Sequence, residues 1–230
     1  MDFYNSLIKE ALELTQGLNE INYDYASDNA WRDVGLNQVI LQRDTAYELS
    51  GTGFNLITSS PVFDGTVVIG DELCDIRDKR KFTRITLVQT DEQEDQQKTY
   101  NLIRKIEYVK YHYFPDGYMI RTSSRSHQEA IRVSKDAVKK GISFEKVGNL
   151  LINKYKENPA VKGVRVIFIT SPQADHRAFE AMAQKSNSIT ETLNHVMNSV
   201  NFDCSTCNLK PICDEVEGMK ELHFKNAGMR

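Results

Sequence analysis

Long apolar runs are absent from this sequence. No segment approaches the ~18 apolar residues of a membrane-spanning helix. The N-terminal stretch MDFYNSLIKEALEL carries acidic residues and lacks the apolar run and small-residue cleavage site of a secretion signal. An excess of positive charge is also lacking, since 29 Lys and Arg stand against 32 Asp and Glu. We therefore expect a cytoplasmic protein that binds neither nucleic acid nor a membrane.

The short motifs of common catalytic sites are missing as well. There is no glycine-rich phosphate loop, no HExxH pair and no arrangement of Ser, His and Asp typical of hydrolases. Nucleotide hydrolysis and acyl-enzyme chemistry therefore have no support. Four histidines are scattered over different expected elements, and we assign them no chemistry: His112, His127, His176 and His195.

The chain is long enough, at 230 residues, to bury a substantial core. Apolar residues at helical spacing predict one helix in FYNSLIKEALEL, residues 3–14, ended by Gly17, and another over residues 98–113, followed by a turn at FPDG. Short runs rich in Val, Ile, Leu and Thr between residues 35 and 90 predict strands of one sheet, namely NQVILQ, TAYELS, GTVVIG and RITLVQT.

The next segment predicts a helix-turn-helix pair. Its first helix would carry Ile131 to Val138 and end at Gly141, and its second would begin at the N-cap Ser143. VRVIFIT then predicts a buried strand, and Ser171 with Pro172 predicts the start of a further helix. This order indicates an α+β (mixed α/β) fold, with a mixed sheet packed by helices in one domain over residues 1–200.

Residues 201–230 form a short tail that contains three of the four cysteines, Cys204, Cys207 and Cys213. In a reducing compartment such a cluster more often binds metal than forms disulfides. A C-x2-C turn can aim two thiolates at one cation, and Cys213 is close enough along the chain to complete a three-sulfur face. Soft thiolates favour an iron-sulfur cluster or zinc. The tail is thus predicted to be a metal-binding segment.

The fourth ligand is open at this point. His223 would give C-x2-C-x5-C-x9-H, which suits a Cys3His zinc site. An ordinary surface or capping histidine is an equally good interpretation of His223. Cys74 would give four thiolates for a [4Fe-4S] cluster, although taken alone it has the pattern of a small buried hydrophobe. Asp214 and an exogenous ligand are the other candidates.

A family resemblance bears on this choice. The stretch AIRVSKDAVKKGISFEKVGNLLINKYKENPAVKGVRVIFIT, preceded by TAYELSG and DGTVVIGDELCDI and followed by C-x-x-C, resembles the middle domain of the acetyl-CoA synthase of carbon monoxide dehydrogenase/acetyl-CoA synthase complexes. The similarity is collinear over roughly residues 35–207. It implies that Cys204 and Cys207, and with them Cys213, are ligands of an iron-sulfur cluster, and it favours [4Fe-4S] over zinc.

The resemblance stops short of the synthase reaction. In that family two further cluster cysteines follow after a longer gap, and a later Cys-Gly-Cys holds a distal nickel. Here Cys213 follows Cys207 after five residues, and the sequence contains no Cys-Gly-Cys. The resemblance therefore implies an iron-sulfur protein that acts with a protein partner, in electron transfer or assembly, in anaerobic one-carbon (carbon monoxide or corrinoid) metabolism. A metalloenzyme with an open cluster or nickel site and a zinc-stabilised binding module are the alternatives.

Overall fold

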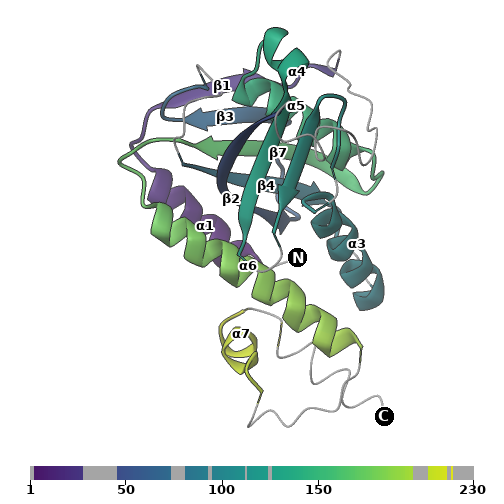
Figure 1. The fold of residues 1–230 in the computed structure, drawn as a ribbon. Coiled ribbons are helices and arrows are strands. Elements are labelled where there is room, and N and C mark those ends of the chain that lie inside the picture. The colour runs from purple at the N-terminus through teal and green to yellow at the C-terminus, as the bar shows by residue number, and fades with distance from the viewer. Residues whose placement is uncertain are drawn as a thin grey trace.

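The structure is a computed structural model that describes residues 3–27, 46–73, 81–92, 95–111, 113–123, 126–198, 207–216 and 219. Within these residues, seven strands form one mixed sheet with helices packed against it (Figure 1). The elements in chain order are α1 (Asn5–Thr15), β1 (Glu20–Asp24), β2 (Ala46–Thr58), β3 (Gly65–Ile69), β4 (Phe82–Thr90), α3 (Gln96–Val109), β5 (Tyr118–Thr122), β6 (Gln128–Ser134), α4 (Lys135–Lys139), α5 (Phe144–Lys156), β7 (Val161–Ile169), α6 (His176–Met197) and α7 (Lys210–Glu215).

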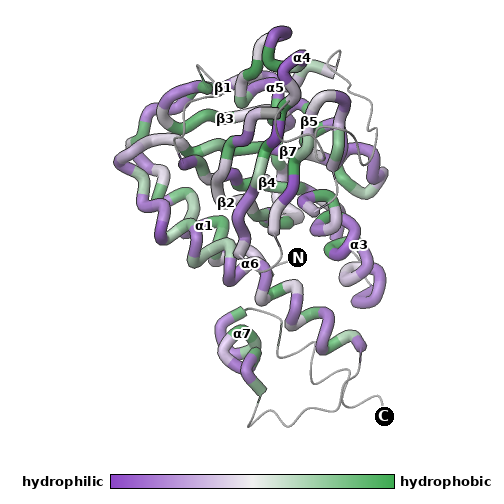
Figure 2. Tube along the Cα trace, in the orientation of Figure 1, coloured by the Kyte–Doolittle hydropathy of each residue, from purple (hydrophilic) through white to green (hydrophobic). Residues whose placement is uncertain are grey.

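The strands lie in the order β1-β3-β7-β4-β2-β6-β5. Two neighbouring pairs are parallel, β3 with β7 and β2 with β4, and the other neighbours are antiparallel. All five residues of β3 are buried, as are most residues of β4, because helices cover both sides of the central strands. Figure 2 shows this contrast, with hydrophobic central strands and a largely hydrophilic α3. The predicted α+β fold with a mixed sheet is confirmed.

Opposite faces of the sheet carry different helices. Asn55, Thr86, Val166 and Thr66 are in-register partners across four strands and so point to one face. Helix α5 packs on that face, since its Tyr155 hydroxyl donates to the Asn55 side-chain oxygen at 2.8 Å.

Helix α6 lies on the other face. Thr83 of β4 points to the side opposite Thr86, and its hydroxyl lies 3.2 Å from His176 at the start of α6. Helix α1 runs beside α6, as Figure 1 shows, and α3 contacts both α5 and α6. The sheet core is therefore covered on both sides.

Several helix boundaries follow their predicted signals. The Ser143 hydroxyl accepts the Lys146 N–H at 3.1 Å and begins α5, as predicted. Gly17 and Gly141 adopt positive φ angles of 79° and 84° just after α1 and α4, which is the left-handed conformation that ends many helices. Asp95 in the acidic loop accepts the Lys98 N–H at 2.8 Å and caps α3.

The predicted helix from Ile131 to Val138 is wrong in its first half. Residues Gln128–Ser134 form strand β6, in which Ile131 pairs with Leu49 and Val133 with Tyr47 of β2. β-Branched residues at alternating positions fit a pleated strand, and here sheet pairing overrides the helical spacing. Only Lys135–Lys139 is helical, with Ser134 as its N-cap. The predicted helix-turn-helix pair is thus reduced to its second helix and a single turn.

The start of α6 also differs from the prediction. The Asp175 carboxylate accepts the N–H groups of Arg177 and Ala178 and caps the helix, which begins at His176. Ser171 instead accepts the Gln173 N–H at 3.3 Å in a local turn. The predicted strand NQVILQ lies outside the described residues. Within the part of the chain that is described, no helix has the length and apolar content needed to cross a membrane.

Candidate functional site

The cysteine segment contains helix α7, which has six residues and so fewer than two turns. Cys207 lies just before it, where its carbonyl oxygen accepts the Lys210 N–H at 3.2 Å. Pro211 occupies the first turn of α7, where a missing N–H costs nothing. Cys213 lies within α7, and its N–H donates to the Leu209 oxygen at 3.3 Å. Both thiol-bearing residues are partly exposed, and the short helix fixes the backbone between them.

Helix α7 lies beside α6 and contacts it (Figure 1). The Glu215 carboxylate lies 2.9 Å from the Lys185 ammonium of α6. Val216 and Met219 are buried and belong to the same hydrophobic cluster as the sheet core, and the half-buried Cys213 packs against that cluster. The segment therefore shares the core of the domain.

Of the other predicted ligands, three lie outside the described residues and one is engaged in an ion pair. Cys204, Cys74 and His223 lie outside the described residues. Asp214 forms an ion pair with Lys210 at 2.8 Å along α7. Among the residues that are described, no group of three or more His, Cys, Asp or Glu is arranged to hold a metal ion. The predicted ligand set thus remains a prediction.

The donor chemistry of the segment fits the group that the resemblance implies. Cys207 and Cys213 are accessible at the surface, and thiolates are the ligands that iron-sulfur clusters and zinc prefer. A bound [4Fe-4S] cluster would supply one-electron transfer. Cys204, Cys207 and Cys213 would hold three of its irons, and the fourth iron would need a further ligand.

A groove at the start of α6 is a second candidate. Its volume is about 490 Å³, and a neighbouring hollow of about 480 Å³ shares part of its rim. His176 forms part of the wall, with Nδ1 3.2 Å from the Thr83 hydroxyl and Nε2 3.2 Å from the Ser171 oxygen. Because a carbonyl only accepts, Nε2 carries a proton that it donates to Ser171, while the Thr83 hydroxyl can either donate to Nδ1 or accept from it. These two contacts fix the orientation of the His176 ring in the wall of the groove, and sequence reasoning assigned it no chemistry.

The rim of this groove carries both signs of charge. Glu48, Glu180 and Lys81 line it together with the neutral Gln128. Because carboxylates and an ammonium line the same opening, the groove does not select between anions and cations. The groove can take a small polar molecule, but its lining does not specify one chemical class.

Sequence reasoning missed a buried cluster of charges on the α5 face of the sheet. Arg84 is fully buried, and its Nε donates to both carboxylate oxygens of Glu129 at 2.8 Å. Burial alone would lower the pKa of Arg84, but the Glu129 carboxylate raises it overall, so the guanidinium stays charged. The Thr122 hydroxyl donates to Glu129 at 3.0 Å. The available signal was an arginine at the start of RITLVQT, a segment predicted to be a strand of the sheet.

A second buried pair, Glu107 and Lys110, joins this cluster through Asn55. The Asn55 amide donates to Glu107 at 3.0 Å, and its oxygen accepts from Arg84 at 3.2 Å. Two cations and two anions thus neutralise one another inside the fold. Buried charges that are paired and hydrogen-bonded in this way serve the structure, because they hold α3 and the sheet in one arrangement.

Comparison with known proteins bears on the whole domain. Residues 38–174 match the family described as CO dehydrogenase/acetyl-CoA synthase complex beta subunit. The match covers more than half of the chain. The chain belongs to this family. A comparison with curated proteins finds no match.

The matched range shows which part of the chain carries the similarity to the acetyl-CoA synthase family. The match runs through β2 to β7 and includes the whole buried charge cluster, so the predicted relationship is confirmed for the sheet domain. It ends before α6 and before Cys204, Cys207 and Cys213. The extension of the resemblance to the C-x-x-C therefore stays a prediction.

Proposed function

We propose that this member of the acetyl-CoA synthase family is an iron-sulfur protein that acts with a protein partner in anaerobic one-carbon metabolism, in electron transfer or assembly. The observation that carries the proposal is the attachment of a thiol-bearing segment to a domain of this family. Cys207 and Cys213 are partly exposed, Cys207 just before α7 and Cys213 within it. A redox centre near the surface suits electron exchange with a partner.

The proposed ligands are Cys204, Cys207 and Cys213, with His223 or Cys74 as the fourth protein ligand. Four thiolates favour [4Fe-4S], whereas three thiolates and one imidazole suit zinc. If neither residue binds, one iron keeps an open position, which is what makes a metal available to a substrate. The fourth ligand therefore separates a carrier of electrons from a metalloenzyme and from a zinc-stabilised binding module.

Acetyl-CoA synthesis itself does not follow from family membership. Beyond the three tail cysteines, the sequence contains only Cys74, and it has no Cys-Gly-Cys. A nickel site that binds methyl and carbonyl groups together needs soft donors, which this set does not supply in addition to a cluster.

Metal analysis of anaerobically purified protein tests the proposal. We expect iron and acid-labile sulfide in near-equal amounts in the wild type and their loss in Cys204→Ser, Cys207→Ser and Cys213→Ser. His223→Asn and Cys74→Ser then identify the fourth ligand, with His127→Asn as a control histidine outside the tail. Stoichiometric zinc without iron in protein prepared under exclusion of oxygen would contradict the iron-sulfur proposal.

A further inference from the structure

We propose that α6 is the docking surface that positions the cysteine segment for metal binding, with Lys185, Val216 and Met219 as positioning residues. This inference rests on the metal site proposed above and adds residues that have no metal-ligating chemistry. It concerns how the thiol-bearing backbone is held, and it makes metal affinity depend on contacts away from the thiols.

The contacts combine one ion pair with two buried apolar side chains. Lys185 and Glu215 lie 2.9 Å apart, and their side chains are 31% and 58% exposed, so the pair is weakened by solvent. Val216 is 5% exposed and Met219 is fully buried. Burial of the two apolar side chains therefore contributes more to the stability of the attachment than the ion pair does. The ion pair fixes the position of the segment along α6.

The position of Lys185 shows how far the segment reaches along α6. Lys185 precedes the last residue of α6, Met197, by 12 positions, which is about 18 Å along a helix. Glu215, at the end of α7, contacts this point, so the end of α7 is held near the middle of α6. Cys213 is two residues before Glu215 and packs against the same hydrophobic cluster. The attachment therefore fixes where Cys213 is presented.

These attachments are made by an ammonium, a carboxylate and apolar side chains, so they do not depend on the ionisation of a thiol. A segment held in this way binds metal without first ordering its backbone. When only a fraction of molecules is competent to bind, the apparent dissociation constant rises in inverse proportion to that fraction. Loosening the attachment should therefore weaken metal binding even though every ligand is kept.

The test is a titration of anaerobic, reduced apo-protein with Co²⁺ alone, followed by thiolate-to-cobalt absorption in competition with a chelator. We expect Met219→Ala to weaken Co²⁺ binding about tenfold or more, because the competent fraction falls. Lys185→Glu should weaken binding roughly three- to fivefold, which is the scale of a partly exposed ion pair. The charge exchange Lys185→Glu with Glu215→Lys should restore most of the loss.

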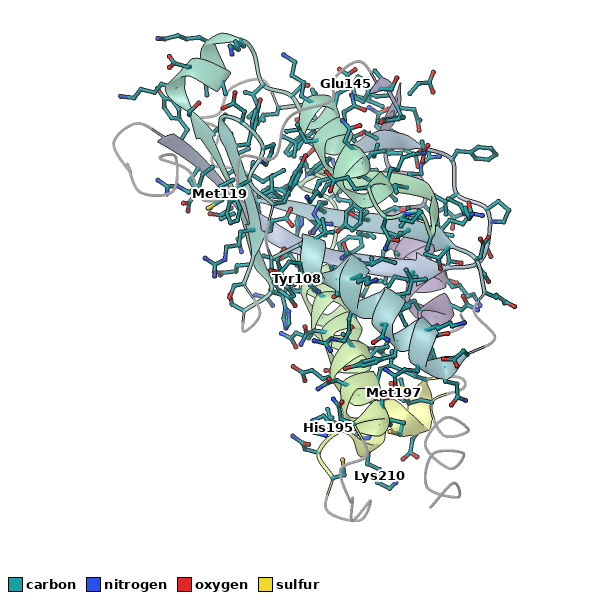
Figure 3. All side chains as sticks on the ribbon, turned by 90° about the vertical axis from the view of Figure 1, so that its right-hand side faces the viewer. Tyr108, Met119, Glu145, His195, Met197 and Lys210 are labelled. Atoms are coloured by element: carbon teal, nitrogen blue, oxygen red, sulfur yellow. The ribbon has the colours of Figure 1, made fainter. Side chains whose placement is uncertain are left out.

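Matched controls separate positioning from general destabilisation. Met119 is a buried methionine of β5, 6% exposed, and Figure 3 shows it in the upper part of the view, well away from Lys210, the first residue of α7, near the bottom. Lys139 forms an exposed ion pair with Asp136 in α4. Met119→Ala and Lys139→Glu should leave the Co²⁺ affinity within about twofold of the wild type, because Met119 is outside the hydrophobic cluster that contains Val216 and Met219 and Lys139 is paired within α4.

The outcomes distinguish this inference from the proposed function. Wild-type affinity in Met219→Ala and in Lys185→Glu, together with loss of binding in Cys207→Ser, would overturn the docking role and leave the metal site standing. Absence of Co²⁺ binding by the wild type would overturn both. Lys185→Glu keeps the test decisive if Met219→Ala does not fold, because Lys185 is a surface residue.

Discussion

At the residue scale, the buried charge cluster shows how this fold tolerates ions in its core. The Arg84 guanidinium donates to Glu129, Asn55 and Thr86, and a residue at the position of Gly53 with a Cβ atom would collide with the Glu129 carboxylate. The close packing leaves each ion with a fixed partner. A buried ion pair of this kind adds little net stability. Removing one of its two ions is costly, however, because the other ion is left buried without its counter-charge.

Removing one member of the Arg84–Glu129 pair should therefore be severe. We expect Glu129→Leu to lower the free energy of unfolding by about 3–5 kcal/mol, because it leaves the Arg84 guanidinium buried without its counter-charge. Urea denaturation of the single variant and of Arg84→Met/Glu129→Leu measures this effect, and the double variant should be the more stable of the two. A double variant that is less stable than the single variant would contradict the account. Lys139→Met, in an exposed pair, is the neutral control.

Buried tyrosines should make the protein sensitive to alkali. Burial raises the pKa of Tyr4 and of Tyr155 above its ordinary value, with nearby Glu107 acting in the same direction for both. Their contribution to stability is complete below about pH 10, where the unfolded tyrosine is still protonated, and it is lost as the pH rises from there toward the folded-state pKa. Urea denaturation from pH 8 to 11 should show this decline.

Substitution of single tyrosines shows how much each one contributes to this decline in stability. Each buried tyrosine should contribute up to roughly 1.4 kcal/mol per pH unit, so Tyr155→Phe should reduce the slope of stability against pH. Tyr108→Phe, at a site that is 59% exposed, should leave it unchanged. Equal slopes in the wild type and in Tyr155→Phe would count against this explanation.

At the element scale, the sequence predicts helices and strands well where local and tertiary preferences agree. Ser143 and Gly141 mark true boundaries because caps and left-handed turns are local chemistry. β6 was missed because Ile131 and Val133 satisfy both a helical and an alternating pattern, and only pairing with β2 decides between them. Arg84 was not recognised as a cluster residue because its partner Glu129 is 45 positions away.

Packing between α5 and the sheet gives an element-scale prediction. Gly148 lies in α5, and a Cβ atom there would come within 2.0 Å of the Thr66 hydroxyl oxygen. In an exposed helix, alanine would be more favourable than glycine by about 1 kcal/mol. Here we expect Gly148→Ala to destabilise the protein, because the contact forces α5 away from β3, and Thr66→Ala in the same chain should recover part of the loss. Thermal unfolding measures this effect, and a rise in Tm for Gly148→Ala would contradict the prediction.

At the scale of the whole molecule, the tail packs on a domain that supplies most of the hydrophobic core. The division into a domain over residues 1–200 and a metal-binding tail over residues 201–230 stays a prediction. The structure adds that Val216 and Met219 of the tail join the hydrophobic cluster of the domain. Sequence alone did not predict this docking, because the short tail has no periodic pattern that identifies its partner surface.

This arrangement predicts that the fold does not depend on the metal. The sheet and its helices already bury a domain-sized core, unlike small metal-dependent domains that unfold without their ion. We expect Cys204→Ser/Cys207→Ser/Cys213→Ser to keep the circular dichroism spectrum and cooperative unfolding of the wild type. Hydrogen exchange should increase only within the last ~30 residues, next to the lost ligands, because α6 still holds the segment at Glu215, Val216 and Met219. Global unfolding of the triple variant would refute the expected independence.

The central claim is that the cysteine segment of this acetyl-CoA synthase family member binds an iron-sulfur cluster. Electron paramagnetic resonance of the anaerobic, dithionite-reduced protein tests it most directly, because a reduced [4Fe-4S] cluster is paramagnetic and zinc is not. The account predicts a cluster signal in the wild type that disappears in Cys207→Ser. A reduced wild-type protein that contains one equivalent of zinc and gives no signal would contradict it.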